Sequence, residues 1–170
     1  MFLRKRGFTL IEVVVAVFIF IVTVVIAGGT FVSALSLQRR ALNLKKVEED
    51  GRFILELMAR EIRFANPIFA PNTCFYTNDF SFQHPVNGLV EYSIRNGMVR
   101  RYAITQGADT FISSPDIEVL GMRFCITGNE PNDDKQPRVT IILRLRTGGS
   151  VREAAALDLQ TTVSQRVLSD

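Results

Sequence analysis

The 170-residue chain has few of the residues from which catalytic and metal sites are built. It contains one histidine, His84, and two cysteines, Cys74 and Cys125, which are too far apart to form a C-x-x-C pair. Neither a zinc site nor a thiol redox motif is therefore expected. The sequence also has no P-loop, no dinucleotide-binding glycine pattern and no G-x-S-x-G element. His84 lies in the turn-like stretch FQHPVNG, so we assign it no catalytic role and expect neither enzyme activity nor a cofactor.

The small excess of positive charge is weak evidence for a nucleic-acid partner. The formal net charge of +3 depends on Arg4, Lys5 and Arg6, which stand in the short stretch before Gly7. Without that stretch, the Lys and Arg total falls from 20 to 17 and equals the Asp and Glu total of 17. A formally neutral remainder does not favour binding to the phosphates of DNA or RNA.

The stretch from Phe8 to Leu37 contains a single charged residue, Glu12, and no Lys or Arg. A helix of this length is roughly 45 Å long, more than the roughly 30 Å hydrocarbon core of a bilayer. The cations before it are expected to stay in the cytoplasm, which places the residues after 38 on the outer side. The stretch VSA at 32–34 resembles a secretory cleavage site, but the apolar run is about twice as long as such a signal.

Glu12 is the residue of this segment that needs an explanation. It lies about 6 Å along the helix axis from Phe8, near the cytoplasmic interface, so inserting it costs well below the about 3 kcal/mol of a charge at the bilayer centre. A positive group on another chain would offset this cost, since two unit charges about 4 Å apart attract by about 4 kcal/mol at an effective dielectric of about 20. Cutting the chain after Gly7 would create such a group, the amine of Phe8.

The stretch RKRGFTLIEVVVAV resembles the leader and the start of type IV pilins and of the pseudopilins of type II secretion systems. The resemblance rests on the basic leader, Gly7, Phe8, Thr9-Leu10-Ile11 and Glu12. It implies that a prepilin peptidase cuts between Gly7 and Phe8, that Phe8 is then N-methylated, and that Glu12 pairs with the amine of a neighbouring subunit during filament assembly.

The same resemblance implies a location and partners. It places the protein in the inner membrane with a periplasmic or extracellular outer domain, and later in a pilus or pseudopilus. Other pilin or pseudopilin subunits and an inner-membrane assembly platform are the further partners that it implies. The sequence does not distinguish a pilus from a secretion or competence system.

The expected organisation is a leader at 1–7, a membrane and assembly helix at 8–37, an amphipathic continuation of the helix at 38–66, and an outer domain of antiparallel strands at 67–170. A predicted buried stripe in the continuation follows spacings of three and four, and Pro67 ends the helix. The stripe consists of Phe53, Ile54, Leu57, Met58, Ile62 and Ala65.

Glycines mark two places where the long helix is open to disturbance, because each costs about 1 kcal/mol relative to alanine in a helix interior. One is Gly51 and the other is the pair Gly28-Gly29. For the pair, two interpretations stay open: the helix extends or unwinds there as the subunit leaves the membrane, or the small residues permit close helix packing.

The pair Asn96-Gly97 predicts a β-hairpin within LVEYSIRNGMVRRYAI. A two-residue turn pairs Ile94 with Val99, whereas a three-residue loop with Gly97 in the left-handed conformation pairs Ile94 with Met98. We favour the second register because it gathers more apolar side chains on one face. That face would contain Val90, Tyr92, Ile94, Met98, Tyr102 and Ile104.

Three further strands are expected. The phase of alternation changes within IEVLGMRFCI, which predicts a bulge near Leu120 or Gly121 and turns Cys125 away from the core. RVTIILRLR alternates regularly, with Val139, Ile141, Leu143 and Leu145 inward and Arg144 and Arg146 outward. The tail at 154–168 predicts a last strand with Leu157, Leu159, Thr161 and Val163 on one face, and REAAAL before it is a candidate short helix.

These elements favour an α+β fold, a long N-terminal helix packed on an antiparallel sheet, as in the pilins. EEDGRFILELMAREIRFA also resembles the corresponding stretch of larger minor pilins and pseudopilins of the PilW and GspJ type. In an exported domain a Cys74–Cys125 disulfide is expected, and closing a loop of this size stabilises by about 4 kcal/mol. Two buried free thiols are the alternative.

Two binding functions remain as alternatives at this point. The loop at 128–137 gathers oxygen ligands of the kind calcium prefers, but their spacing does not match an EF-hand, and we expect a plain turn without a metal. These ligands are Asn129, Glu130, Asn132, Asp133 and Asp134. A DNA-uptake or adhesion module is the second alternative if the strand arginines meet on one side. They are Arg95, Arg100, Arg101, Arg123, Arg144 and Arg146. An exported enzyme anchored by its signal is a third alternative, against which the lack of a catalytic motif counts.

Overall fold

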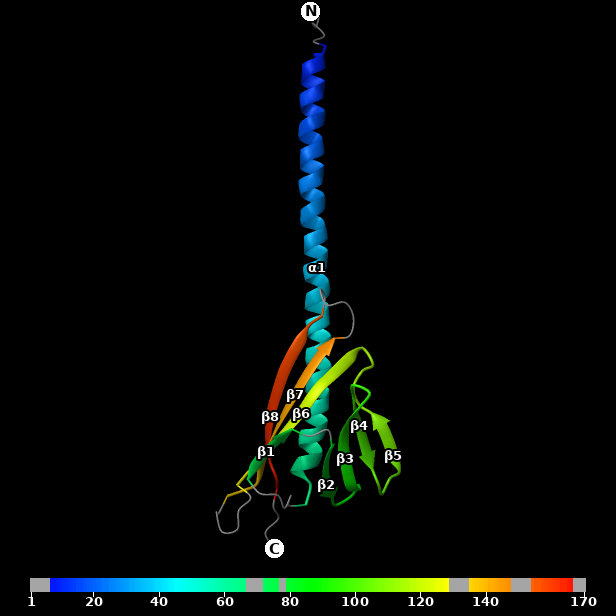
Figure 1. Cartoon of the computed structure of the whole chain (residues 1–170), viewed down its shortest axis with the longest axis vertical. Coiled ribbons are helices and arrows are strands. Elements are labelled where there is room, and N and C mark those ends of the chain that lie inside the picture. The colour runs from blue at the N-terminus through cyan, green and yellow to red at the C-terminus, as the bar shows by residue number, and fades with distance from the viewer. Residues whose placement is uncertain (1–6, 67–71, 77–78, 129–134, 148–153, 167–170) are drawn as a thin grey trace, which may run out of the picture. The chain divides into compact units, whose positions relative to one another are not determined.

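The computed structural model describes residues 7–66, 72–76, 79–128, 135–147 and 154–166 (Figure 1). Within them, one helix, α1 (Leu10–Arg63), is followed by strands. The strands are β1 (Thr73–Tyr76), β2 (Asp79–His84), β3 (Gly88–Arg95), β4 (Met98–Ala103), β5 (Ala108–Phe111), β6 (Ile117–Thr127), β7 (Arg138–Thr147) and β8 (Ala156–Ser164). The expected α+β class is confirmed. Contacts divide the chain into two compact units, Met1–Arg39 and Arg40–Asp170.

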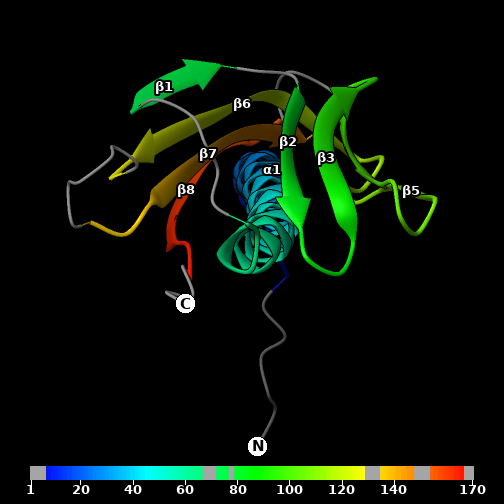
Figure 2. The same cartoon turned by 90° about the horizontal axis from the view of Figure 1, so that it is seen from below.

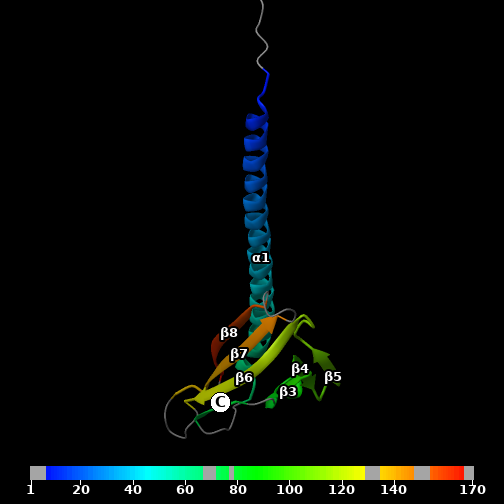
Figure 3. The same cartoon turned by 45° about the horizontal axis from the view of Figure 1, so that its top comes forward.

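The second unit contains two antiparallel sheets that arch over the second half of α1 (Figure 2). The strand order is β1-β6-β7-β8 in the first sheet and β2-β3-β4-β5 in the second. Figure 3 shows β6, β7 and β8 side by side, with β3, β4 and β5 in the other sheet. The backbone joins the two sheets where the N–H of Val119 donates to the carbonyl of Gly97 at 2.7 Å.

The first sheet follows the sequence prediction closely. The register between β6 and β7 shifts between Val119 and Gly121, which confirms the predicted bulge. The bulge allows Ile117 and Val119 before it and Met122 after it to be buried together, although they differ in phase. The inward residues predicted for β7 are buried, and Arg144 and Arg146 are exposed.

The cysteines lie opposite each other in this sheet. Cys74 of β1 is the register partner of Cys125 of β6, and the two form a disulfide. The predicted bond is confirmed, and the free-thiol alternative is excluded. The predicted short helix at REAAAL is wrong for the described part, because Ala154 and Ala155 are irregular and Ala156 and Leu157 already belong to β8.

In the second sheet the favoured hairpin register is wrong. Ile94 pairs with Val99 and Arg95 with Met98, across a two-residue turn. Asn96 and Gly97 both have positive φ, 53° and 71°, as the favoured two-residue hairpin turn requires. In this register Val99, Arg101 and Ala103 lie on one face of β4, and Met98, Tyr102 and Ile104 do not join the core face.

The error has a physical cause. The predicted register places the largest number of apolar side chains on the core face, and in that register Arg101 points outward. The core instead contains an acidic partner for Arg101, the helix residue Glu61, at 2.5 Å between guanidinium and carboxylate. The face of β4 that contains Arg101 is therefore turned toward the core because Arg101 forms a buried ion pair there, although the other face carries more apolar side chains.

The helix buries a broader face than the predicted stripe, because sheets pack against it from two sides. Ile54, Met58 and Ile62 are buried as expected, together with Leu55. Phe53, predicted to be buried, is 56% exposed and lies on the remaining face. The helix passes through Gly28-Gly29 and through Gly51 without interruption.

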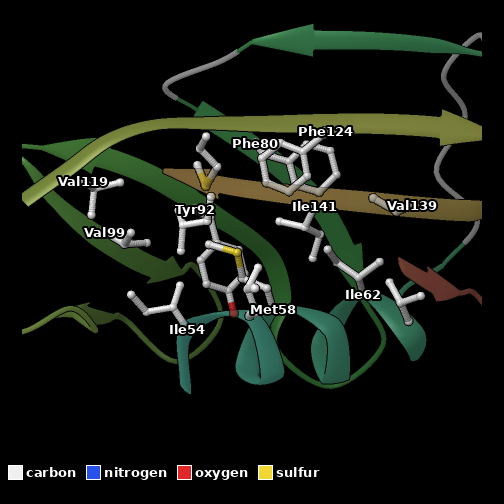
Figure 4. Packing of buried hydrophobic residues seen from close by; sticks show 14 of the residues in the cluster. Ile54, Met58, Ile62, Phe80, Tyr92, Val99, Val119, Phe124, Val139 and Ile141 are labelled. Carbon is white, nitrogen blue, oxygen red and sulfur yellow. The ribbon is translucent and has the colours of Figure 1, made fainter. Parts of the chain in front are cut away.

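Figure 4 shows the helix residues Ile54, Met58 and Ile62 meeting side chains from both sheets. Phe80 of β2 stacks on Phe124 of β6, with ring centroids 3.9 Å apart, and so joins the two sheets. The end of β8 completes the unit: the buried Gln165 side chain donates to the carbonyls of Ile62 and Asn66. Ile62 lies in the last turn of α1 and Asn66 just beyond it, so these bonds tie the end of the helix to the end of the chain's last strand.

Candidate processing and assembly site

The start of α1 is closed by a capping box. The N–H of Glu12 donates to Thr9 Oγ1, and Glu12 Oε2 accepts the N–H of Thr9, each at 3.4 Å. This is the reciprocal arrangement of the pattern S/T-x-x-E, which satisfies two of the free N–H groups of a helix start. The sequence analysis missed it, although T-L-I-E carries the signature. Glu12 thus has a role in its own chain besides the pairing implied by the resemblance.

The capping box leaves room for a second partner. Within the described residues, Glu12 Oε1 accepts no hydrogen bond, and the side chain is exposed. Negative charge at a helix N-terminus is favoured by the helix dipole. A cation from outside the chain can therefore approach one carboxylate oxygen while the other continues to cap the helix.

Gly7 and Phe8 precede the helix and are both exposed. An added side chain at Gly7 would meet nothing within 4 Å, and its φ is not in the left-handed region. The described fold thus gives no reason for glycine at this position. Its role in a cleavage signal stays a prediction.

The first unit presents an apolar surface on which the hydroxyl groups after Thr9 bond the helix's own backbone. All of its large apolar side chains from Phe8 to Leu37 are exposed, and α1 is long and apolar enough there to cross a membrane. The hydroxyls of Thr23 and Ser33 donate to the carbonyls of Ile19 and Gly29, four residues earlier, at 2.8 and 3.0 Å. A helix whose hydroxyls bond its own backbone is suited to lipid, where water cannot satisfy them.

Gly28 and Gly29 lie in the same exposed helix. An added Cβ at either position would meet nothing within 4 Å, so a single chain contains no close packing there. The two interpretations of this pair both involve a change or a partner beyond one subunit, and both remain predictions.

The second unit contains a buried charge cluster that the sequence analysis did not find. Glu61 of α1 accepts hydrogen bonds from Arg101 of β4, from the hydroxyl of Tyr92 in β3, and from the Asn87 side chain at 3.2 Å. The Glu61 and Arg101 side chains are only 9% and 13% exposed. A glutamate within the buried helix stripe was the available signal, since a charge there needs a partner.

The cluster changes the acidity of its members. Burial alone would raise the pKa of Glu61, but the hydrogen bonds from Arg101 and Tyr92 and the charge of Arg101 outweigh it, and the pKa is lowered. Burial and the hydrogen bond to Glu61 raise the pKa of Tyr92. Glu61 thus stays ionised and Tyr92 stays a hydrogen-bond donor, which makes the cluster a structural clamp between helix and sheet.

Five of the six strand arginines have an acidic partner and do not form an open basic patch. Arg95, Arg100, Arg144 and Arg146 pair with Asp79, Asp109, Asp158 and Glu118, at distances from 2.6 to 2.9 Å. Arg101 belongs to the buried cluster. The acids neutralise the charge that a DNA-binding surface would need, so the DNA-uptake alternative gains no support.

His84 takes no part in a metal site among the described residues, and the calcium alternative for the loop at 128–137 is not tested by them. His84 ends β2, and its Nδ1 accepts the backbone N–H groups of Val86 and Asn87, which fixes a turn. No group of three or more His, Cys, Asp or Glu side chains gathers in the described part of the chain. Residues 129–134, which contain the oxygen ligands of the calcium alternative, lie outside it.

Comparison with protein families supplies independent support for the N-terminal site. The model of the prokaryotic N-terminal methylation motif matches residues 3–28, which include Gly7, Phe8 and Glu12. Comparison with curated proteins and with solved structures gives no match. In pilins this motif accompanies membrane association and assembly with other pilin subunits. The protein therefore carries the class III signal of prepilins, and with its long apolar N-terminal helix it fits the type IV pilins and pseudopilins.

Proposed function

We propose that the protein is a minor pilin or minor pseudopilin that helps to start or cap a filament. A prepilin peptidase cuts between Gly7 and Phe8, and Phe8 is N-methylated. The helix then holds the subunit in the inner membrane, with residues 38–170 on the periplasmic side, until an assembly platform moves it into the filament. Its role is structural, and the protein is a substrate of an enzyme.

One observation supports this function above all: the methylation motif at 3–28 leads into an apolar helix whose only charge is Glu12. The exposed apolar side chains suit both lipid and the packed helices of a filament core. The minor role is supported by the second unit, in which β6 and β7 have 11 and 10 residues and a second sheet is present. A subunit that only repeats along a filament has less need of such an elaborate outer unit.

Cleavage is tested by replacing Gly7 in the native host. In Gly7→Leu the peptidase should leave the precursor uncut, because the added side chain occupies space that glycine leaves open. Intact-mass analysis should find the chain starting at Met1, whereas the wild-type chain starts at a methylated Phe8. Gly28→Ala, also at a glycine surrounded by open space, is the control and should be processed normally. A mature mass for Gly7→Leu would contradict the cleavage site.

Pairing of Glu12 with a neighbouring subunit is tested by two variants, one that keeps the capping box and one that weakens it. Glu12→Gln keeps the cap, since glutamine also serves in a capping box, but it removes the charge. Glu12→Ala removes the charge and the half of the cap that the Glu12 side chain makes, the bond from the N–H of Thr9. If the charge pairs with the amine of another subunit, both variants should be cleaved normally and both should be depleted from filaments, measured by quantitative immunoblotting.

Thr9→Ala is the matched control, because it weakens the cap and keeps the charge. It should be incorporated nearly as well as the wild type. Normal incorporation of Glu12→Gln with depletion of Thr9→Ala would show that Glu12 acts only as a cap, and would remove intersubunit pairing from the proposal.

A further inference from the structure

A groove of about 740 Å³ runs between α1 and β8 in the second unit. One wall includes Phe53 of α1 and Phe64 just after it, which are 56% and 51% exposed, and the strand wall includes Leu159. The groove thus combines exposed aromatic side chains with a volume typical of binding sites.

The strand wall is an unpaired sheet edge. β8 is the last strand of its sheet and lies beside α1 (Figure 2). The carbonyl of Ala155 and the N–H of Gln165 both bond toward β7, to Thr147 and Pro137, and no register shift separates them. Because bonding direction alternates along an antiparallel strand, the even-numbered residues, including Gln160, direct their N–H and C=O groups away from β7.

Arg166, two residues beyond β8, follows the same alternation of bonding direction. The N–H of Arg166, also even-numbered, bonds outward to the carbonyl of Arg63 at 3.0 Å. The last residue of α1 thus provides a hydrogen-bond partner for an outward N–H group at one end of the edge. No described segment bonds the outward N–H and C=O groups of Gln160. Unpaired backbone groups on a strand edge are a ready template for another strand.

The groove is also positively charged. Arg52, Arg60, Arg63 and Glu56 line it, and in the described part of the chain only Arg52 has an ion-pair partner, Glu48 at 2.6 Å. Within the described residues, the guanidinium groups of Arg60 and Arg63 have no partner, in contrast to the strand arginines. They stand three residues apart on one side of α1, about 5 Å along the axis.

We infer that this groove receives an extended, acidic segment of a neighbouring filament subunit, which adds as a strand to the open edge of β8. The open edge favours an extended segment, and Arg60 and Arg63 favour carboxylates in it. Alternate residues of a strand lie about 7 Å apart on one face, so two of them can meet the two guanidinium groups. The identity of the donor as a filament subunit rests on the proposed function.

The size of the groove sets the length of the segment. From Arg52 to Phe64 the helix wall extends roughly 18 Å, at about 1.5 Å per residue. At about 3.4 Å per residue, an extended chain covers this distance with about five residues. A short strand, and not a folded domain, is therefore the element that enters the groove.

The test uses the full-length protein in lipid nanodiscs and a synthetic peptide, so that filament assembly is not required. An acetylated peptide that alternates valine and glutamate carries a benzophenone group, and an otherwise identical peptide carries lysine in place of glutamate. After irradiation, intact-mass analysis measures the cross-linked fraction, and fragment mapping locates it. We expect the acidic peptide to cross-link to α1 and β8 residues of the groove about tenfold more than the basic one, because charge complementarity selects the partner.

Three variants separate the contributions. Arg60→Glu with Arg63→Glu should reverse the preference between the two peptides, whereas Arg138→Glu, on the outer face of β7, should not. Gln160→Pro removes an outward N–H and leaves the bonds to β7, so it should reduce cross-linking by the acidic peptide. Gln160→Ala keeps that N–H and should behave as the wild type.

Equal cross-linking by both peptides, or cross-links that map outside the groove, would overturn the inference. So would an unchanged yield in Gln160→Pro, because strand addition needs that edge. Each of these outcomes leaves cleavage at Gly7 and the effect of Glu12 unaffected, so the proposed function is judged separately.

Discussion

The first sheet, β1-β6-β7-β8, contacts α1 through apolar side chains, whereas the second, β2-β3-β4-β5, also contacts it through a buried ion pair. At Gly51 the first sheet comes so close that a Cβ would lie 2.3 Å from a methyl group of Leu159. At Glu61 the second sheet is held by hydrogen bonds from Arg101 and Tyr92. The helix is therefore attached to the first sheet by close apolar packing and to the second sheet also by a buried ion pair.

The two modes of attachment differ in what a mutation does to them. Apolar packing is lost in proportion to the contacts removed and the cavity created. A buried ion pair is lost unevenly, because removing one partner leaves the other charged and buried. The second sheet should therefore be the more sensitive of the two to a single substitution.

The largest effect is expected from Arg101→Met, which leaves the Glu61 carboxylate with only neutral partners. The cost should be about 3–5 kcal/mol in the free energy of unfolding, typical of an uncompensated buried charge. It is measured by urea unfolding of the full-length protein in detergent, followed by near-ultraviolet circular dichroism. The double variant Glu61→Leu with Arg101→Met should recover most of the loss. A double variant that is less stable than Arg101→Met would show that charge is not the cause.

The same cluster predicts a dependence on pH. Because the pKa of Glu61 is lower in the folded protein than its ordinary value of 4.5, the ionised form stabilises the fold above that pH. The contribution is lost as the pH falls through the folded pKa. Between about pH 5 and pH 3 the unfolding midpoint of the wild type should therefore fall more steeply than that of Glu61→Gln. Parallel profiles would contradict the assignment, since the exposed acids titrate in both proteins.

An intermediate effect is expected where the first sheet approaches the helix. Gly51→Ala places a Cβ 2.3 Å from Leu159 Cδ1 and 2.6 Å from Leu145 Cδ1, so both leucines must move within a packed core. Overpacking costs about 1–3 kcal/mol, of which the helix propensity of alanine offsets about 1 kcal/mol. The free energy of unfolding of the second unit should therefore fall by up to about 2 kcal/mol. Gly29→Ala, with open space around it, is the control and should leave this unit unchanged.

The difference between the sheets also explains what could be predicted from the sequence. The alternation of β7 and the bulge at Val119–Gly121 were correctly predicted, because apolar period and phase determine which face of a strand is buried. The hairpin register was not, because it depends on an acid 40 residues earlier in the chain that turns Arg101 inward. Phe53 was misplaced for a related reason, since periodicity cannot show from how many sides a helix is covered.

The N-terminal site shows the complementary limit. Gly7, Phe8 and Glu12 were predicted from their pattern, and the methylation motif covers all three, while their individual roles stay predictions. The cap made by Thr9 was not predicted, although T-L-I-E carries the capping-box signature. The groove beside β8 had no signal in the sequence, because it depends on which strand ends a sheet and on which arginines find acids in the fold.

The smallest effect is expected at an ion pair of the same chemistry on the outer face of the first sheet. Arg144 and Asp158 form two hydrogen bonds of 2.8 Å, as close as those of the buried cluster, but their side chains are 63% and 53% exposed. Water and salt screen such a pair, so Arg144→Ala should cost less than about 1 kcal/mol, and added salt should abolish the difference from the wild type. Arg101→Met should keep most of its cost at the same salt concentration, because its partner is shielded from solvent. If both variants lost their effect in salt, burial would not be what distinguishes the attachment of the two sheets, and the charge at Glu61 would act as an ordinary surface contact.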